Sequence, residues 1–259
     1  MLVFIVLLLE DLRLSMDFFK QTFTAESLQE GQVFLLDKPL GWTSFQVVNK
    51  IRWHLKNLTG LKKLKVGHAG TLDPLATGLL LVCTGKQTKS IELYQNQSKE
   101  YTGTLCLGAT TPSFDLETEI DAYFPTEHIT REKIEQTLGQ FRGEIEQYPP
   151  VFSALKKDGK RLYEYARAGL QPEIKSRKVT VSTFEILQMN LPKIEFRVEC
   201  SKGTYIRSLA HDFGKALASG GHLFELRRTK IGTYTIENAF GMMSVLNEPA
   251  STMKRVTSN

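Results

Sequence analysis

The segment VGHAGTLDPLATGLLLVCTGKQTK (66–89) joins a glycine-rich loop to an apolar run. Two glycines flank His68, and a lone carboxylate, Asp73, stands directly before Pro74. Glycines permit tight turns, and a proline biases the preceding residue toward an extended conformation. The apolar run LLLVCT (79–84) predicts a fully buried strand. The pattern allows a rigid loop that presents Asp73, although Asp before Pro more often simply caps a turn.

Two nucleotide-site interpretations of the same segment fail. TGKQT resembles a phosphate loop, but a Walker A motif needs glycine where Leu80 stands and serine or threonine where Gln87 stands. No GxGxxG motif follows a predicted strand, so dinucleotide binding has no support either.

Outward from this segment, strand and helix signals alternate without a regular strand–helix repeat. Short apolar or alternating runs predict strands at 32–37, 193–200 and 222–236. Helical spacing of apolar residues predicts helices at 44–55, 130–139 and 204–219. Ser44 and Thr130 are the expected N-caps. This order predicts an α+β domain around a central, largely antiparallel mixed sheet flanked by helices.

Charge is distributed unevenly along the 259 residues, although the net charge is only +5. Residues 38–72 hold seven Lys or Arg and no acid, and residues 156–178 hold eight against three acids. Residues 113–147 between them are acidic. Segregated basic segments favour a phosphate-binding face or an ordinary solvated surface, and charge alone does not separate the two.

The cysteines and the two terminal segments of the chain limit the cellular compartments that we expect for the protein. Three widely spaced cysteines without a CxxC pair support neither a disulfide framework nor a zinc site. The apolar residues 1–9 are too short to span a bilayer and lack the features of a signal peptide. We expect residues 1–15 to be a non-native or disordered extension from a misassigned start codon, residues 241–259 to be a flexible tail, and the protein to be cytoplasmic without a membrane partner.

The segment GHAGTLDPLATGLL (67–80) resembles the catalytic motif of the TruB-type pseudouridine synthases. Further segments resemble other parts of that family in the same order, at 35–52, 99–115, 147–169, 200–214 and 222–232. This resemblance implies a pseudouridine synthase fold over residues 16–240, with an RNA-gripping insertion at about 147–178. After Ile231 too few residues follow for a full PUA domain.

The resemblance implies an isomerase that converts uridine to pseudouridine at position 55, in the TΨC arm of tRNA. The reaction breaks the N1–C1′ glycosidic bond of a flipped-out uridine, turns the base and rejoins it through C5. Asp73 would be the catalytic carboxylate, as a nucleophile at the sugar or the base, or as the stabiliser of a positive sugar. Neither a metal nor an organic cofactor is implied.

Further site residues follow from the same resemblance. Arg207 would be the charged partner of Asp73, and Tyr101 would stack on the uracil. The other expected pocket residues are Lys38, His68, Tyr205 and Leu226.

The expected partner is tRNA, bound by a monomer through its phosphate backbone. The candidate RNA-binding residues are Lys65, Lys156, Lys157, Lys160, Arg161, Arg167, Arg227 and Arg228. The main alternative function is a non-catalytic tRNA-binding protein that assists tRNA folding, and a second is a related synthase acting on rRNA.

Overall fold

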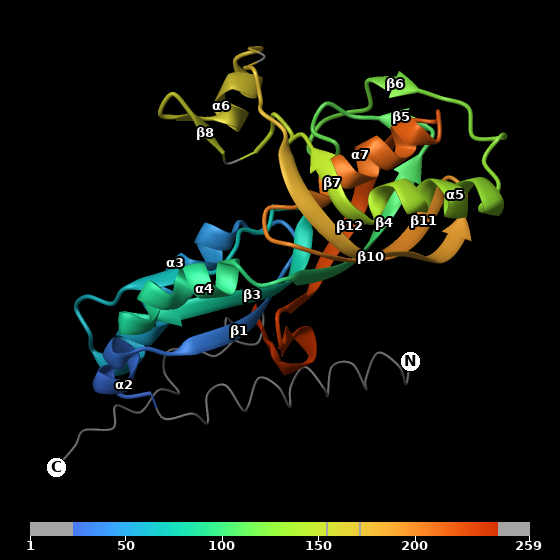
Figure 1. Cartoon of the computed structure of the whole chain (residues 1–259). Coiled ribbons are helices and arrows are strands. Elements are labelled where there is room, and N and C mark those ends of the chain that lie inside the picture. Colours follow the sequence, from blue (N-terminus) through green and yellow to red (C-terminus); the bar gives the residue numbers. More distant parts are fainter. Residues whose placement is uncertain (1–22, 154, 171, 243–259) are drawn as a thin grey trace, which may run out of the picture. The chain divides into compact units, whose positions relative to one another are not determined.

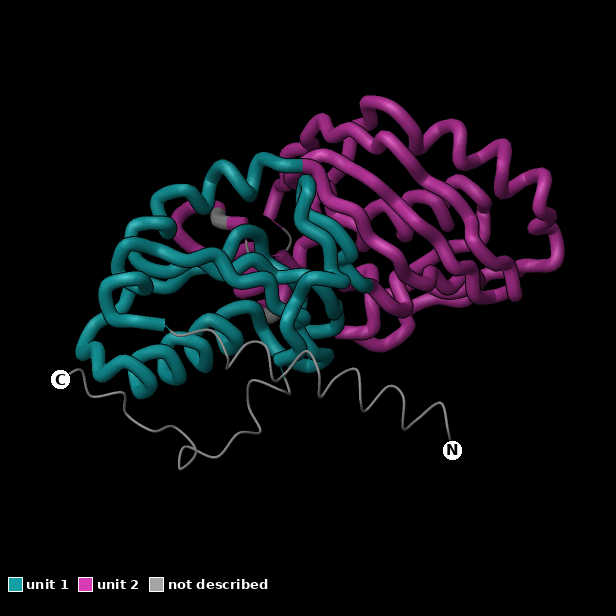
Figure 2. The backbone as a smooth tube through the Cα atoms, turned by 90° about the horizontal axis from the view of Figure 1, so that it is seen from below, with its two compact units in different colours: residues 1–97, 227–259 teal, residues 98–226 magenta. Residues whose placement is uncertain are grey.

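The computed structural model describes residues 23–153, 155–170 and 172–242. These residues form two compact units, one from the chain up to Gln97 together with the chain from Arg227 onward, and one from Ser98 to Leu226 (Figure 2). A single catalytic domain was expected from the sequence, with no boundary at these positions. The expectations for residues 1–15 and for most of 241–259 lie outside the described residues.

The first unit is built on strand β3 (Ala76–Thr84), whose residues are almost all buried. Strand β1 (Val33–Lys38) pairs antiparallel with it from Val33↔Cys83 to Lys38↔Gly78. Strand β2 (Val66–His68) pairs with the end of β3. β1 also pairs in parallel with β14 (Phe240–Gly241), and the end of β12 (Gly221–Ile231) pairs with β13 (Tyr234–Thr235).

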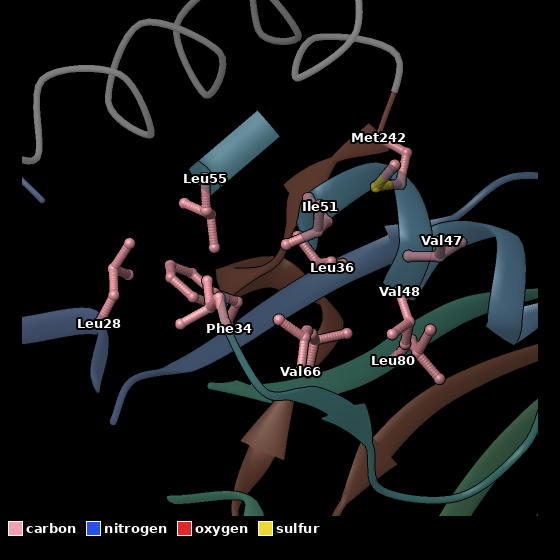
Figure 3. Close-up of a cluster of buried hydrophobic side chains, with 12 residues drawn as sticks. Leu28, Phe34, Leu36, Val47, Val48, Ile51, Leu55, Val66, Leu80 and Met242 are labelled. Carbon is pink, nitrogen blue, oxygen red and sulfur yellow. The ribbon is translucent and has the colours of Figure 1, made fainter. Parts of the chain in front are cut away.

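Helix α3 (Ser44–Thr59) supplies most of the helical side of the first unit's core. Its buried face carries Val47, Val48, Ile51 and Leu55, which pack in one cluster with side chains of β1 and β3 (Figure 3). The helix begins one residue earlier than a cap at Ser44 would place it, because Thr43 is the N-cap and forms a capping box with Gln46. The prediction of Ser44 as the cap is therefore wrong.

Short helices complete the first unit. They are α2 (Ala25–Glu30), α4 (Ile91–Gln95) and the 3-10 helices η1 (Gly85–Ser90) and η3 (Ile236–Asn238).

The second unit contains an antiparallel sheet in the order β4 (Lys99–Leu107), β11 (Lys193–Cys200), β10 (Arg177–Asn190) and β7 (Gly143–Gln147). Helices α5 (Arg131–Leu138) and α7 (Ile206–Ala216) pack against one face of these strands (Figure 1). Phe213 of α7 meets Phe184 of β10 edge-on at 5.4 Å between ring centroids, which is a favourable aromatic geometry.

The segment between β7 and β10 forms small elements of its own. They are strands β8 (Lys156–Lys157) and β9 (Lys160–Arg161) and helix α6 (Leu162–Arg167). The remaining elements of the second unit are β5 (Ala109–Thr110), β6 (Ala122–Tyr123) and the 3-10 helix η2 (Gly139–Phe141).

The predicted fold class is confirmed, since the helices and strands form a mixed α/β structure with largely antiparallel strand pairing. Thr130 caps α5 as expected. The helix predicted at 204–219 is shorter, because Tyr205 is its N-cap residue and Leu217 its C-cap. Among the described residues, no helix combines the length and the apolar character needed to cross a membrane.

Candidate active site

Asp73 lies in a loop between β2 and β3, residues 70–76, which we call the Asp73 loop. Asp73 is half-buried, and its carbonyl accepts a hydrogen bond from the amide of Ala76 at 3.1 Å. The residue before it is fixed by Ser44, whose Oγ accepts from the Leu72 amide at 2.8 Å and donates to the Leu72 carbonyl at 3.0 Å. The hydroxyl that was expected to cap α3 therefore fixes the Asp73 loop.

The residue after Asp73 is fixed by the turn that follows β1. The carbonyl of Pro74 accepts a hydrogen bond from the Gly41 amide at 2.8 Å, and the Lys38 ammonium lies 3.5 Å from it. Lys38 is fully buried and also donates to the carbonyls of Pro39 and Trp42, at 2.9 and 2.7 Å. A buried cation is tolerated only with such partners, and here they join the turn to the Asp73 loop.

Arg228 fixes the start of the loop from β12. Its guanidinium donates to the carbonyls of Leu79 at 2.8 Å and Gly70 at 3.0 Å, with a longer contact to Thr71 at 3.5 Å. Only 1% of Arg228 is exposed. The prediction that Arg228 contacts RNA is therefore corrected: its charged group is enclosed by protein carbonyls, out of reach of a phosphate.

Close approach of β12 to β3 explains one glycine of the motif. Gly78 has a φ of 104°, and a Cβ there would lie 2.3 Å from the carbonyl oxygen of Arg228. Any side chain at this position would therefore push β12 away and displace the guanidinium from the Asp73 loop.

The electrostatics of the first unit's site involve two titratable neighbours of the loop. Burial lowers the pKa of Lys38 to about 8, and the negative charge of Asp73 opposes that effect. Lys38 is thus still largely protonated at neutral pH, beside Asp73. Burial and then the positive charge of Arg228 lower the pKa of His68, which disfavours the protonated ring.

Arg207 projects from α7 and is buried with 4% exposed. Its Nε lies 3.5 Å from Oδ2 of Asp115, and its two terminal nitrogens donate to the carbonyls of Ser113 at 3.2 Å and Phe152 at 3.0 Å. These contacts fix the guanidinium within the second unit. The pairing of Arg207 with Asp73 stays a prediction.

Asp115 is a site residue that was not predicted from the sequence. Its carbonyl accepts hydrogen bonds from the hydroxyls of Thr111 at 2.6 Å and Ser113 at 3.1 Å, which close a tight polar turn. The only available signal was its position at the end of the segment 99–115. One acid among several in an acidic segment gives no reason to expect that this one forms a buried ion pair.

The remaining pocket candidates are placed by the second unit's strands and helix α7. Tyr101 is buried in β4 opposite Val198, and Leu226 is half-buried on β12. The backbone of Tyr205 exchanges two hydrogen bonds with the Gln147 amide, at 2.7 and 3.0 Å. Of the predicted pocket, Lys38 and His68 share a unit with Asp73, whereas Tyr101, Arg207, Tyr205 and Leu226 belong to the other.

The candidate RNA-binding residues fall on both units. Lys65 is exposed in the first unit, and Arg227 pairs there with Asp37 at 2.6 Å. In the second unit Lys160 and Arg161 are exposed, and the Lys157 ammonium donates to the Glu173 carbonyl at 2.8 Å. Lys156 lies in β8 and Arg167 in α6.

Comparison with known proteins gives the class first. Residues 56–206 match the model described as TruB family pseudouridylate synthase (N terminal domain), and residues 207–255 match the tRNA pseudouridylate synthase B C-terminal domain. The mixed α/β fold, the Asp73 loop and the two family matches together define an isomerase of the pseudouridine synthase class. The chain belongs to the TruB family of these enzymes.

Individual relatives agree with this assignment. A tRNA pseudouridine synthase B of Flavobacterium johnsoniae is 66% identical over 217 residues, which cover 83% of this chain and 95% of that protein. The corresponding protein of Phocaeicola vulgatus is 59% identical over 218 residues, 84% of this chain and 93% of that protein.

Solved structures show the same likeness. A chain of a Cbf5–Nop10–Gar1 complex superposes with a TM-score of 0.62 at 34% identity, over 83% of this chain and 53% of its own length. An H/ACA RNP bound to a substrate RNA containing 2′-deoxyuridine gives a TM-score of 0.59 at 32% identity, over 83% and 52%. The chain thus spans about half the length of the solved proteins it matches.

Proposed function

We propose that this enzyme isomerises the uridine at position 55, in the TΨC arm of tRNA, and that Asp73 is its catalytic carboxylate. Relatives at 66% and 59% identity carry the name tRNA pseudouridine synthase B, which supports tRNA as the substrate. The observation that carries the role of Asp73 is the fixation of its loop on both sides, at Leu72 by Ser44 and at Pro74 by Gly41 and Lys38.

This fixation matters because a carboxylate that reacts with a nucleoside must keep its position through bond cleavage and rejoining. Loop contacts that exist before substrate arrives remove the cost of ordering the loop during the reaction. The ammonium of Lys38 adds a positive charge beside Asp73. Asp73 then acts on the sugar or the base, or stabilises the positive sugar, while the detached uracil turns to present C5 to C1′.

The second unit supplies the proposed contacts to the uracil. Tyr101 stacks on the flipped base, and Tyr205 and Leu226 line the pocket. Arg207 is fixed by Asp115, Ser113 and Phe152, which limits its guanidinium to one orientation.

Extrusion of the uridine from its stack costs about a few kcal/mol, which contacts with the RNA backbone offset. Exposed Lys160 and Arg161 of the second unit supply such contacts, with Lys156, Lys157 and Arg167 nearby in sequence. Lys65 and Arg227 are the corresponding candidates in the first unit. We propose that the enzyme works as a monomer in the cytoplasm, without a metal or an organic cofactor.

The test is pseudouridine formation in an unmodified tRNA transcript, mapped by position, with wild type, Asp73→Asn and Asp121→Asn. We expect wild type and the exposed control Asp121→Asn to modify position 55, and Asp73→Asn to lose activity by roughly 10³-fold or more. Product from Asp73→Asn at the wild-type rate would remove Asp73 from the chemistry. Tight tRNA binding without product from wild type would favour the tRNA-folding role instead.

A further inference from the structure

A second basic surface lies in the first unit, at the end of β3 remote from Asp73. A groove of ≈ 490 Å³ opens there between α2, η1 and the segment that precedes β2. Its charged side chains are all lysines, Lys63, Lys65, Lys86 and Lys89. We call this the lysine groove.

The floor of the lysine groove is a fixed backbone. The amide of Gly85 donates to the Lys65 carbonyl at 2.9 Å, which joins η1 to the segment before β2. Gly85 has a φ of 51°, and a Cβ there would lie 2.1 Å from the carbonyl oxygen of Gln29. The close approach of α2 therefore requires a glycine, and the lysines project from a surface held by three segments of the chain.

The positive charge of the groove is largely uncompensated. Lys86 pairs with Glu30 at 2.7 Å, whereas within the described part of the chain Lys63, Lys65 and Lys89 form no ion pair. Like charges that converge on one groove repel one another, so a polyanionic partner would relieve an unfavourable interaction of the free protein.

The chemistry of the groove favours a phosphate backbone over a free nucleotide. The Gly85 amide already donates to Lys65, and the Thr88 hydroxyl donates to the Gly85 carbonyl at 2.7 Å, so the TGKQT segment is not arranged as a phosphate cradle. What remains are flexible point charges, which bind phosphates without reading a base.

The position of the groove sets the part of the RNA that it would reach. β3 has nine residues, of which the first, Ala76, is the last residue of the Asp73 loop, and the last precedes Gly85. At about 3.3 Å per residue, the two ends of β3 are roughly 26 Å apart. A phosphate bound in the groove would therefore lie several nucleotides or more from the uridine at Asp73.

We propose that the lysine groove binds the sugar–phosphate backbone of the substrate RNA at a point remote from the target uridine. The inference rests on the proposed function, because it takes tRNA as the RNA that occupies the Asp73 site. It adds a binding surface in the unit that carries the catalytic carboxylate, separate from the basic segment of the second unit.

The experiment measures tRNA binding between about 50 and 300 mM KCl for wild type, Lys65→Ala/Lys89→Ala and a control, Lys133→Ala/Lys215→Ala, which removes the same charge from α5 and α7. We expect the groove variant to reduce the slope of log K against log salt by about 1.5 to 2 and to raise Kd roughly tenfold at low salt. The control should keep the wild-type slope. Lys65→Arg/Lys89→Arg, which keeps both charges, should restore it.

Equal slopes for the groove variant and the control would overturn the inference. A reduced slope in the alanine variant that the arginine variant does not bring back to the wild-type value would overturn it too. Pseudouridine formation by wild type on the same tRNA is measured in parallel. If wild type forms product and the groove variant keeps the wild-type salt slope, only the RNA-binding role of the lysine groove is rejected. Absence of product from wild type rejects the proposed function, and with it the premise of the groove.

Discussion

The Asp73 loop and the segment 153–173 of the second unit are stabilised in opposite ways. Hydrogen-bond partners of the Asp73 loop lie 28 to 158 residues away in sequence, at Ser44 and Arg228. Among the described residues of the segment 153–173, two side-chain hydrogen bonds are local and span 8 and 16 residues, from Tyr165 to Lys157 and from Lys157 to Glu173. The proposed chemistry thus depends on the packing of a whole unit, whereas the proposed RNA contacts depend on local structure.

The comparison is tested most strongly by Arg228→Met. Loss of the guanidinium removes its hydrogen bonds to the carbonyls of buried Leu79 and half-buried Gly70, so we expect a loss of about 3 to 5 kcal/mol in unfolding free energy and a fall in kcat. The measurements are urea unfolding and single-turnover pseudouridine formation.

Its neighbour Arg227 provides the matched control for stability. Arg227 pairs with Asp37 on the surface, with side chains 41% and 30% exposed, so Arg227→Met should cost at most about 1 kcal/mol. Equal losses for the two variants would show that the loop does not depend on Arg228.

Lys38 gives a pH-dependent test of the same loop. Its pKa is about 8 in the folded protein, below the ordinary 10.5, so the unfolded chain binds this proton more tightly. The contribution of Lys38 to stability should therefore increase as the pH rises between these two pKa values, by roughly 1.4 kcal/mol per pH unit. Urea unfolding of wild type and Lys38→Met across the same pH range measures it. Parallel stability curves would contradict the burial of a charged Lys38.

Ser44→Ala separates fixation of the loop from stability of α3. The variant leaves the Leu72 amide without its acceptor, which should cost about 1 to 2 kcal/mol and lower kcat several-fold with little change in KM. Thr43→Ala, which removes the N-cap of the same helix, should cost about 1 kcal/mol without that kcat effect. A matching fall in kcat for both variants would mean that α3, rather than the Ser44 hydroxyl, controls the loop.

Lys160→Ala is expected to have the smallest effect. Its side chain is exposed in the locally stabilised segment, so tRNA affinity should fall about threefold and the salt slope by about 1, with the unfolding free energy unchanged. Fluorescence titration at several salt concentrations measures both. A large loss of stability would show that the segment is coupled to the core after all.

The fold was predictable where the sequence signal is local. The alternation of apolar and charged residues in KIEFRVEC predicted β11, and Thr130 as an N-cap predicted the start of α5. Strand β10 was not predicted, because two register shifts, between Val181 and Thr183 and between Ile186 and Gln188, interrupt its alternation.

The candidate site was predictable only in part, because only local patterns can be read from a sequence. Asp73 was singled out through family resemblance, because the loop motif alone favours an Asp that caps a turn. The roles of Ser44 and Arg228 were not, because each acts on a backbone group far away in sequence, and no local pattern records such a contact. Asp115 was missed likewise, since its partner Arg207 lies on a helix of distant sequence.

The discontinuity of the first unit has a consequence during synthesis. Arg228 is translated 158 residues after Gly70, once the whole second unit has been made. At about 5 to 20 residues per second, that delay is roughly 10 to 30 s. Through that interval a nascent chain already carries Asp73 but lacks the guanidinium that fixes its loop. The ribosome therefore releases Asp73 long before it releases the arginine that holds the start of the Asp73 loop, and final ordering of the loop is left to the nearly finished polypeptide.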